Sequence, residues 1–109
     1  MARTRPHRET EASFMRAVCQ LAALGGWRIF HPYLSIRSAP GFPDLLLTRP
    51  GQPIIYVECK LDGKRPTPAQ QAWLEALQQA SGTEVHVWRP SDWSAIEARL
   101  LCYDAPVLS

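Results

Sequence analysis

The chain has 109 residues, of which 46% are hydrophobic, and it carries a formal net charge of +2. This length supports one domain with a modest core, and so small a net charge does not by itself indicate a nucleic-acid partner. We find no apolar segment long enough for a signal peptide or a bilayer-spanning helix, so we expect a cytoplasmic protein with no membrane partner.

A helix and a short strand are predicted first. Thr10 can cap a helix whose apolar residues recur at helical spacing, and the pair Gly25-Gly26 ends it. Residues 27–31 then have the pattern of a strand. A loop rich in serine, proline and glycine follows over residues 32–43.

Two strands joined by a tight turn come next. Residues 45–48 form an apolar run, and the strand that ends at Lys60 alternates in period two, so Glu58 and Lys60 share one face. The sequence Arg-Pro-Gly-Gln at 49–52 provides a turn that returns the chain as an antiparallel partner. Asp44 stands where the preceding loop enters the first strand. The predicted hairpin therefore carries two acids and a lysine.

A helix, a strand and a last helix complete the chain. Thr67 followed by Pro68 starts a helix that runs to about Ala80. Ser91 is the expected cap of the last helix, whose apolar residues form one stripe. The predicted strands are residues 27–31, 45–48, 54–60 and 85–88. The order αβββαβα predicts an α/β fold with a mixed central sheet of about four strands flanked by helices.

The hairpin residues have the chemical types that a metal-dependent phosphodiester hydrolase needs. Mg²⁺ prefers oxygen ligands and is commonly held by one or two carboxylates with water and phosphate oxygens, which Asp44 and Glu58 could supply. Lys60 could position the attacking water or offset developing charge. The backbone carbonyl of Cys59 is a further candidate ligand. Taken alone, either acid could be an ordinary surface residue, because acids are common in loops and on edge strands.

Four ordered segments carry a family resemblance. They are Arg37-Ser38-Ala39-Pro40-Gly41-Phe42-Pro43-Asp44, Glu58-Cys59-Lys60, Thr67-Pro68-Ala69-Gln70 with Trp73 and Leu74, and Val85-His86-Val87-Trp88-Arg89-Pro90. In this order they closely resemble the PD-(D/E)XK nuclease superfamily, and more narrowly its virus-type replication-repair nuclease family, VRR-Nuc. The resemblance implies a restriction-endonuclease-like core and one nuclease domain over residues 10–109, behind a basic arm over residues 1–9. It also implies Mg²⁺ or Mn²⁺ as cofactor and no organic cofactor.

The same resemblance implies two supporting residues in the site. In the family a glutamine on the helix after the catalytic strand contributes to the active site, and Gln70 occupies that place, with its neighbour Gln71 as the alternative. Gln70 also fits a capping box with Thr67, which is a purely structural role. The family places an acid on its first helix near the metal, for which Glu11 is the better candidate and Glu9 the other. Both glutamates could equally be favourable charges at a helix N-terminus.

Basic residues near the predicted site are candidates for DNA contacts. Arg8 belongs to the N-terminal arm, Arg37 lies in the loop before Asp44, and Lys64 and Arg65 follow the strand of Glu58. These side chains could neutralise phosphates around the acidic metal site. The arm could equally be a solvated terminus, because charge runs often are.

The predicted activity is that of a Mg²⁺- or Mn²⁺-dependent endonuclease that hydrolyses DNA phosphodiester bonds. Small stand-alone members of the resembling family look like homodimers that act on branched DNA. The resemblance therefore implies a homodimer with a specificity like that of a Holliday junction resolvase, in the cytoplasm of a bacterium or a phage-infected cell. The alternatives are a flap or single-strand nuclease and a non-catalytic DNA-binding module of the same fold. Metal-dependent cleavage separates these classes.

Overall fold

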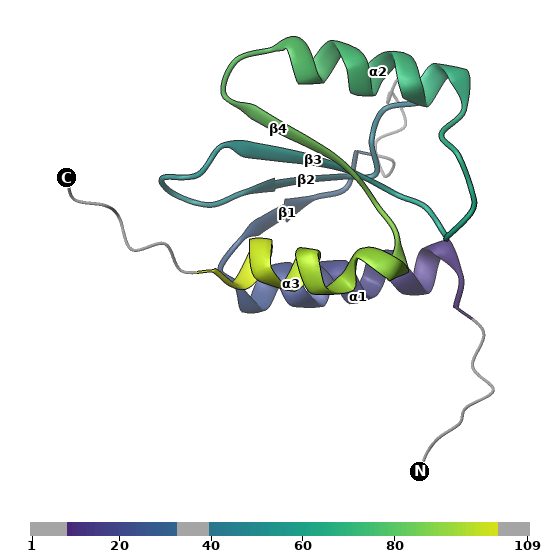
Figure 1. Cartoon of the computed structure of the whole chain (residues 1–109). Helices are drawn as coiled ribbons and strands as arrows, with labels where there is room; N and C mark the ends of the chain where they lie inside the picture. Colours follow the sequence, from purple (N-terminus) through teal and green to yellow (C-terminus); the bar gives the residue numbers. More distant parts are fainter. Residues whose placement is uncertain (1–8, 33–39, 103–109) are drawn as a thin grey trace.

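The computed structural model describes residues 9–32 and 40–102. Within these residues the chain forms a mixed sheet in the order β1-β2-β3-β4, with helices on both sides (Figure 1). β2 pairs antiparallel with both β1 and β3, whereas β3 and β4 are parallel. The elements are α1 (Glu11–Leu24), β1 (Arg28–Phe30), β2 (Leu45–Thr48), β3 (Ile54–Cys59), α2 (Pro68–Gln79), β4 (Thr83–Trp88), the 3-10 helix η2 (Pro90–Asp92) and α3 (Trp93–Leu101). The predicted α/β class and the order αβββαβα are confirmed.

The two faces of the sheet are covered unequally. α1 and α3 lie together on one face, and α2 lies on the other (Figure 1). The main core fills the space under the α1 and α3 pair. α2 packs chiefly on β4, and Leu74 is the one residue of α2 that is fully buried. The main core includes Phe14, Val18, Leu45, Leu47, Ile55, Val57, Trp88, Ile96 and Leu100. None of the helices in the described residues is long and apolar enough to cross a bilayer.

Local signals set the starts of α1 and α2 and the turn between β2 and β3. Thr10 and Thr67 each accept a hydrogen bond from the backbone N–H of the third helical residue, whose side chain bonds back to the threonine amide. These capping boxes satisfy N–H groups that have no partner within the helix. The predicted turn is also confirmed, because Gln52 N–H donates to the Arg49 carbonyl at 3.0 Å.

Three strands differ in length from the prediction, and β3 differs by one residue because it ends at Cys59 rather than at Lys60. β1 has three residues rather than the five at 27–31, because the Trp27 amide closes the end of α1 by donating to the Ala22 carbonyl. β4 begins at Thr83 rather than at residue 85, since its parallel pairing with β3 starts opposite Ile54. The hydrogen bond that closes α1 thus decides where β1 begins, and the long-range pairing with β3 decides where β4 begins.

The last helix starts later than predicted. Pro90–Asp92 form the 3-10 turn η2, and α3 begins at Trp93 with Asp92 in the cap position. Ser91 does not cap α3, because its amide and hydroxyl both donate to the Asp62 carboxylate, the hydroxyl at 2.7 Å. The prediction of Ser91 as the cap is therefore wrong: a tertiary partner takes the side chain that a local cap would need.

Arg49 joins the hairpin turn to the ends of both helices on the core face. Its guanidinium donates to the carbonyls of Gly25 at 2.8 Å, Leu100 at 3.3 Å and Cys102 at 3.0 Å. It also lies 4.4 Å from the ring centroid of Trp27. Carbonyls at helix ends have no intrahelical partner, so a charged donor with several N–H groups stabilises them. One side chain thus holds three segments together at this end of the molecule.

We expect Arg49→Ala to lower the free energy of unfolding by roughly 2–3 kcal/mol, since carbonyls at two helix ends lose a charged donor and Trp27 loses a cation over its ring. Urea titration followed by tryptophan fluorescence measures the change. Arg16→Ala is the control, because Arg16 is exposed on α1, and it should change stability by less than about 0.5 kcal/mol. Equal midpoints for the two variants would contradict the role of Arg49.

Candidate active site

Asp44 and Glu58 face each other across the β2–β3 hairpin. Leu45 pairs with Val57, so the next pair outward is Asp44 opposite Glu58, and residues directly opposite in antiparallel strands share a face. The backbone N–H of Cys59 donates to Asp44 Oδ2 at 2.8 Å. This hydrogen bond fixes the Asp44 carboxylate on the strand that carries Glu58. The structure thus brings the two predicted carboxylates together.

Lys60 lies beside Glu58, as the strand alternation predicted. Its Nζ is 3.4 Å from Glu58 Oε2, and the two side chains are only 11% and 2% exposed. The Lys60 backbone N–H donates to the Trp88 carbonyl at 3.0 Å. The amine therefore stands at a fixed position, where the parallel pairing of β3 with β4 ends.

One oxygen of the Glu58 carboxylate is without a protein partner. Oε1 is buried and accepts no hydrogen bond from the residues that the structure describes. Burial, and then the nearby charge of Asp44, raise the pKa of Glu58 from 4.5 to about 7, although Lys60 opposes this. A buried carboxylate is costly unless a cation or further donors reach it. The unpaired oxygen and the facing Asp44 fit a divalent cation that takes oxygen ligands.

The other two groups near the carboxylates are Cys59 and Glu11. The Cys59 thiol lies in the core, and burial is the main cause that raises its pKa, so its side chain is not turned toward the carboxylates. Burial also raises the pKa of Asp44, while the Cys59 N–H and Lys60 lower it and Glu11 raises it further. The Glu11 charge also raises the pKa of Glu58, so α1 starts close to the site.

The acids at the site do not form a closed metal cage. Among residues 9–32 and 40–102, no three His, Cys, Asp or Glu side chains form a group that could hold a metal ion. The site offers the facing pair Asp44 and Glu58, and Mg²⁺ commonly completes such a pair with water and phosphate oxygens. Metal binding by Glu11 and by the Cys59 carbonyl stays a prediction.

Gln70 serves its own helix. Its Oε1 accepts a hydrogen bond from the Thr67 N–H at 2.8 Å, and its backbone N–H donates to Thr67 Oγ1 at 3.1 Å. The capping role is therefore confirmed. Its role in the active site stays a prediction, and the amide Nε2 is the end of the side chain that the cap does not use.

The loop that enters β2 packs directly on α2. The Phe42 ring lies 4.8 Å from Trp73 and 5.9 Å from Tyr56, both in edge-on geometry. Gly41 has a φ of +86°, and a Cβ there would lie 2.6 Å from a backbone carbonyl carbon of α2. Phe42 was not among the predicted site residues, although an aromatic between Gly41 and a proline just before Asp44 is a signal that could have found it. Both residues position Asp44.

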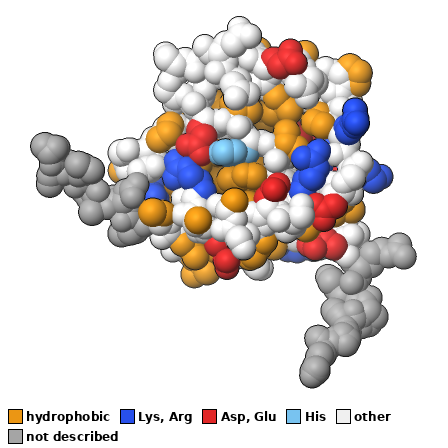
Figure 2. All heavy atoms as spheres, in the orientation of Figure 1, with side chains coloured by type: hydrophobic (Ala, Val, Ile, Leu, Met, Phe, Trp, Pro, Cys, Tyr) orange, Lys and Arg blue, Asp and Glu red, His pale blue; other side chains and the backbone are white. Residues whose placement is uncertain are grey.

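The predicted DNA contacts fall into two groups. Lys64 and Arg65 are exposed in the loop after β3, and the Lys64 carbonyl accepts a hydrogen bond from the Arg89 guanidinium at 2.7 Å. The loop is thus anchored while its charged side chains remain outside. Arg8 and Arg37 lie outside the described residues. The face drawn in Figure 2 mixes acidic and basic side chains rather than presenting one continuous basic surface.

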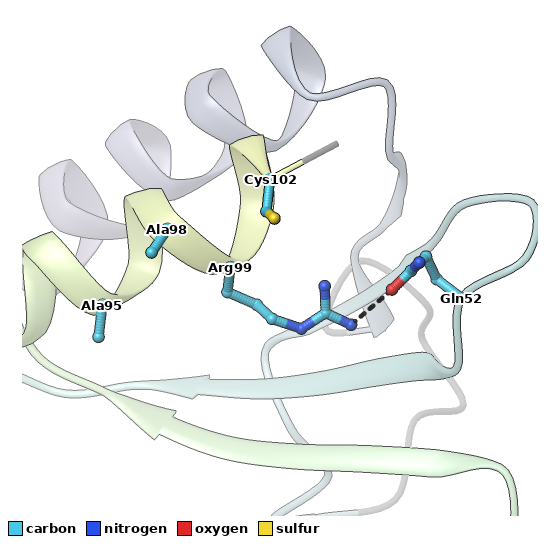
Figure 3. Close-up of a pocket in the computed structure, with 5 residues that line it drawn as sticks. All are labelled: Gln52, Ala95, Ala98, Arg99 and Cys102. Atoms are coloured by element: carbon cyan, nitrogen blue, oxygen red, sulfur yellow. Dashed lines mark hydrogen bonds between the residues drawn. The ribbon is translucent and has the colours of Figure 1, made fainter. Parts of the chain in front are cut away.

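A separate hollow lies at the other end of the hairpin. It is lined by Gln52, Ala95, Ala98, Arg99 and Cys102. Arg99 extends toward the β2–β3 turn and donates to Gln52 Oε1 at 3.0 Å (Figure 3). Two further hydrogen bonds from Arg99 are the main cause that lowers the pKa of Glu84 to about 2. Since the facing carboxylates lie at the opposite ends of β2 and β3, this hollow is not part of the candidate site.

We expect the metal-free protein to lose stability as the pH rises from about 4.5 to about 7. Over this range the folded chain keeps the Glu58 proton that the unfolded chain has lost, because the folded-state pKa is about 7. Rising pH favours the state with fewer bound protons, and over this range that is the unfolded state. The decrease in unfolding free energy is on the order of 3 kcal/mol.

Urea titrations in chelator at pH 4.5 and pH 8 measure this decrease. Glu58→Gln should remove most of it, whereas Glu75→Gln, at an exposed position on α2, should leave it unchanged. Added Mg²⁺ or Mn²⁺ should raise the melting temperature of the wild type at pH 8 but not that of Glu58→Gln. A wild-type stability that is flat with pH and indifferent to either metal would contradict the assignment.

We expect Gly41→Ala to destabilise the fold by roughly 2–4 kcal/mol, because the new Cβ meets both an unfavourable positive φ and the backbone of α2. Gly51→Ala is the matched control. Its φ is +81°, but no atom lies within 4 Å of the added Cβ, so it should cost only about 1–2 kcal/mol. Equal costs in urea titrations would show that the loop does not rest on α2.

The comparison with protein families covers the whole hairpin. Residues 34–92, more than half of the chain, match the family model of the VRR-NUC domain. No curated protein and no solved structure matches the chain. The matched range contains Asp44, Glu58 and Lys60, and the VRR-NUC domain implies a nuclease of the PD-(D/E)XK type, a class that generally uses a divalent metal. The chain belongs to the VRR-NUC domain family.

Proposed function

We propose that this nuclease is a metal-dependent endonuclease that hydrolyses phosphodiester bonds in branched DNA. The observation that supports the metal dependence is the buried Glu58 carboxylate, whose Oε1 has no partner among the described residues and which faces Asp44. Two carboxylates repel each other and repel phosphate, so a module that only bound DNA would gain nothing from burying them together. A divalent cation between them removes both penalties.

Mg²⁺ or Mn²⁺ is the proposed ion, held by Asp44, Glu58 and the backbone carbonyl of Cys59. All of these ligands are oxygens, which suit hard cations, while the buried thiol of Cys59 is turned away. When bound, such an ion polarises a phosphoryl oxygen and makes a water molecule more acidic. The chain contributes a preset geometry, because Asp44 is already fixed by the Cys59 amide.

Lys60 is the proposed partner of the attacking water and of the charge that develops on the phosphate. Its amine is 3.4 Å from Glu58 and almost fully buried, so it acts where the effective dielectric constant is low. Gln70, through its Nε2, and Glu11, from the start of α1, are proposed to support the site. The proposed nuclease domain spans residues 10–109, behind a basic arm over residues 1–9.

The proposed phosphate contacts are Lys64 and Arg65, together with Arg8 and Arg37. Lys64 and Arg65 follow β3 directly, on a loop that Arg89 holds through the Lys64 carbonyl. A fixed loop loses less conformational entropy when its side chains meet a phosphate backbone. Because phosphate contacts carry no sequence information, DNA shape near the cut is the proposed source of selectivity.

The gel that tests this function compares labelled four-way junction, flap, single-stranded and linear duplex DNA with Mg²⁺ or Mn²⁺. We expect metal-dependent cuts in the junction, none with chelator, and a loss of at least about 100-fold in Lys60→Ala, since the amine acts in the chemical step. Lys64→Ala should lose much less. Cuts confined to flaps or single strands would favour that alternative, and a fully active, folded Lys60→Ala variant would contradict the assigned role.

A homodimer is proposed because two active sites related by a two-fold axis could cut two strands of a symmetric junction. Leu24 is 80% exposed at the C-terminal end of α1, and Leu101 is 43% exposed at the C-terminal end of α3. These two helices pack on each other. These apolar side chains support an interface at the end of the molecule away from Glu11. The candidate sites would then stay open on the outside.

We expect sedimentation velocity to show a dimer at micromolar concentration. Leu24→Asp combined with Leu101→Asp should yield a folded monomer, because a charge at an apolar interface is left without its water. A matched pair of changes at exposed positions of α2, Gln78→Asp and Gln79→Asp, should leave the dimer intact. A monomeric wild type that still cuts the junction on both strands would rule out the proposed assembly.

A further inference from the structure

The edge strand β1 turns two side chains of a DNA-binding type toward the face of the sheet that carries the candidate site. Ile29 packs into the core under α1, so its neighbours Arg28 and Phe30 point to the opposite face. Phe30 pairs with Leu46, which in turn pairs with Tyr56. These three side chains therefore form one row across the face on which α2 lies.

The two ends of this row differ in how they are covered. At the Tyr56 end, the Phe42 ring packs edge-on against the rings of Tyr56 and Trp73. α2 itself packs chiefly on β4 (Figure 1). At the β1 end, Phe30 is 55% exposed and Arg28 is exposed beside it. A phenylalanine ring that is half exposed contributes little to folding, and its place on the face of the candidate site leaves it available to a ligand there.

The row lies directly next to the carboxylates. Asp44 precedes Leu46 by two residues, so both side chains share this face with Phe30, and Asp44 faces Glu58 in the next row. From the strand rise and the strand spacing, the Cα atoms of Phe30 and Asp44 are roughly 8 Å apart. Stacked nucleotides follow one another at roughly 3.4 Å along a strand. The ring is thus close enough to reach a nucleotide that adjoins a phosphate bound at the carboxylates.

We propose that Phe30 stacks on an unpaired base close to the scissile phosphate, while Arg28 contacts the backbone of the same strand. An aromatic ring beside a cation is the usual platform for single-stranded nucleic acid, and it accepts any base because every base has an apolar face. The bases of a continuous duplex are stacked on both sides and offer no free face. The substrate class that follows is DNA with at least one unpaired nucleotide next to the cut, as at a branch or a flap.

This inference rests on the proposed nuclease function and adds the requirement for an unpaired base. Binding is measured first, by fluorescence anisotropy of a fluorescein-labelled single-stranded oligonucleotide in Ca²⁺, without turnover. Phe30→Ala should weaken binding about 10-fold or more, Phe30→Tyr should bind like the wild type, and Phe30→Leu should bind like Phe30→Ala. Arg28→Gln should weaken binding and reduce its salt dependence, whereas Arg16→Gln on α1 should not.

Cleavage assays then locate the base that stacks on Phe30. After the cut has been mapped, an abasic nucleotide replaces each of the two bases on either side of it, one at a time. An abasic nucleotide at the position that stacks on Phe30 should slow cleavage by the wild type to the rate of Phe30→Ala. The same nucleotide should not slow cleavage by Phe30→Ala any further. A ring that served only the fold would slow all substrates equally and would lower the melting temperature, which we expect to stay within about 2 °C of wild type.

Two results separate this inference from the proposed function. If the wild type cuts DNA and Phe30→Ala binds and cuts every substrate equally well, the inference is overturned and the nuclease assignment stands. If the wild type cuts nothing with either metal, the nuclease proposal fails, and the binding series alone decides whether Phe30 meets a base. Equal affinities of Phe30→Ala and Phe30→Tyr in that series would overturn the inference as well.

Discussion

The hydrogen bond from the Cys59 amide to Asp44 Oδ2 is the contact on which the candidate site depends. It continues the β2–β3 pairing past Leu45, so that a carboxylate closes the ladder where a backbone carbonyl would otherwise stand. Loss of the acceptor would leave a buried N–H unsatisfied, at a cost of about 1–3 kcal/mol. Asp44 therefore belongs to the fold and to the candidate site at once, and its position opposite Glu58 follows from the sheet itself.

Much of this could be predicted because the deciding contacts are local. The alternation in β3 and the turn at residues 49–52 set the register of one hairpin, and a register fixes which side chains share a face. The sequence failed where a distant partner decides the outcome. Ser91 has the type of a helix cap, yet it bonds Asp62 instead. The exposure of Phe30 could not be predicted from the sequence either, because it depends on α2 packing chiefly on β4 and not on β1.

The unequal layers of the fold separate stability from function. The core under α1 and α3 is deep, and Arg49 ties its helix ends to the hairpin turn. The α2 layer packs chiefly on β4 and on the loop that carries Gly41 and Phe42, and Leu74 is the one residue of α2 that is fully buried. Local opening should therefore be easiest on the α2 side. The candidate site lies on the same face, so access to it does not require the main core to loosen.

The two facing carboxylates lie on one hairpin, and this locality has a consequence for sequence variation. The spacing between Asp44 and Glu58 depends on a short turn and on three residue pairs of the β2–β3 ladder. Insertions after α2, or at the exposed loop that carries Lys64, would lengthen other connections at a small cost in entropy. Such changes would reshape the surface around the candidate site while the acidic pair keeps its geometry. The fold thus lets that surface diverge without any change to the two carboxylates.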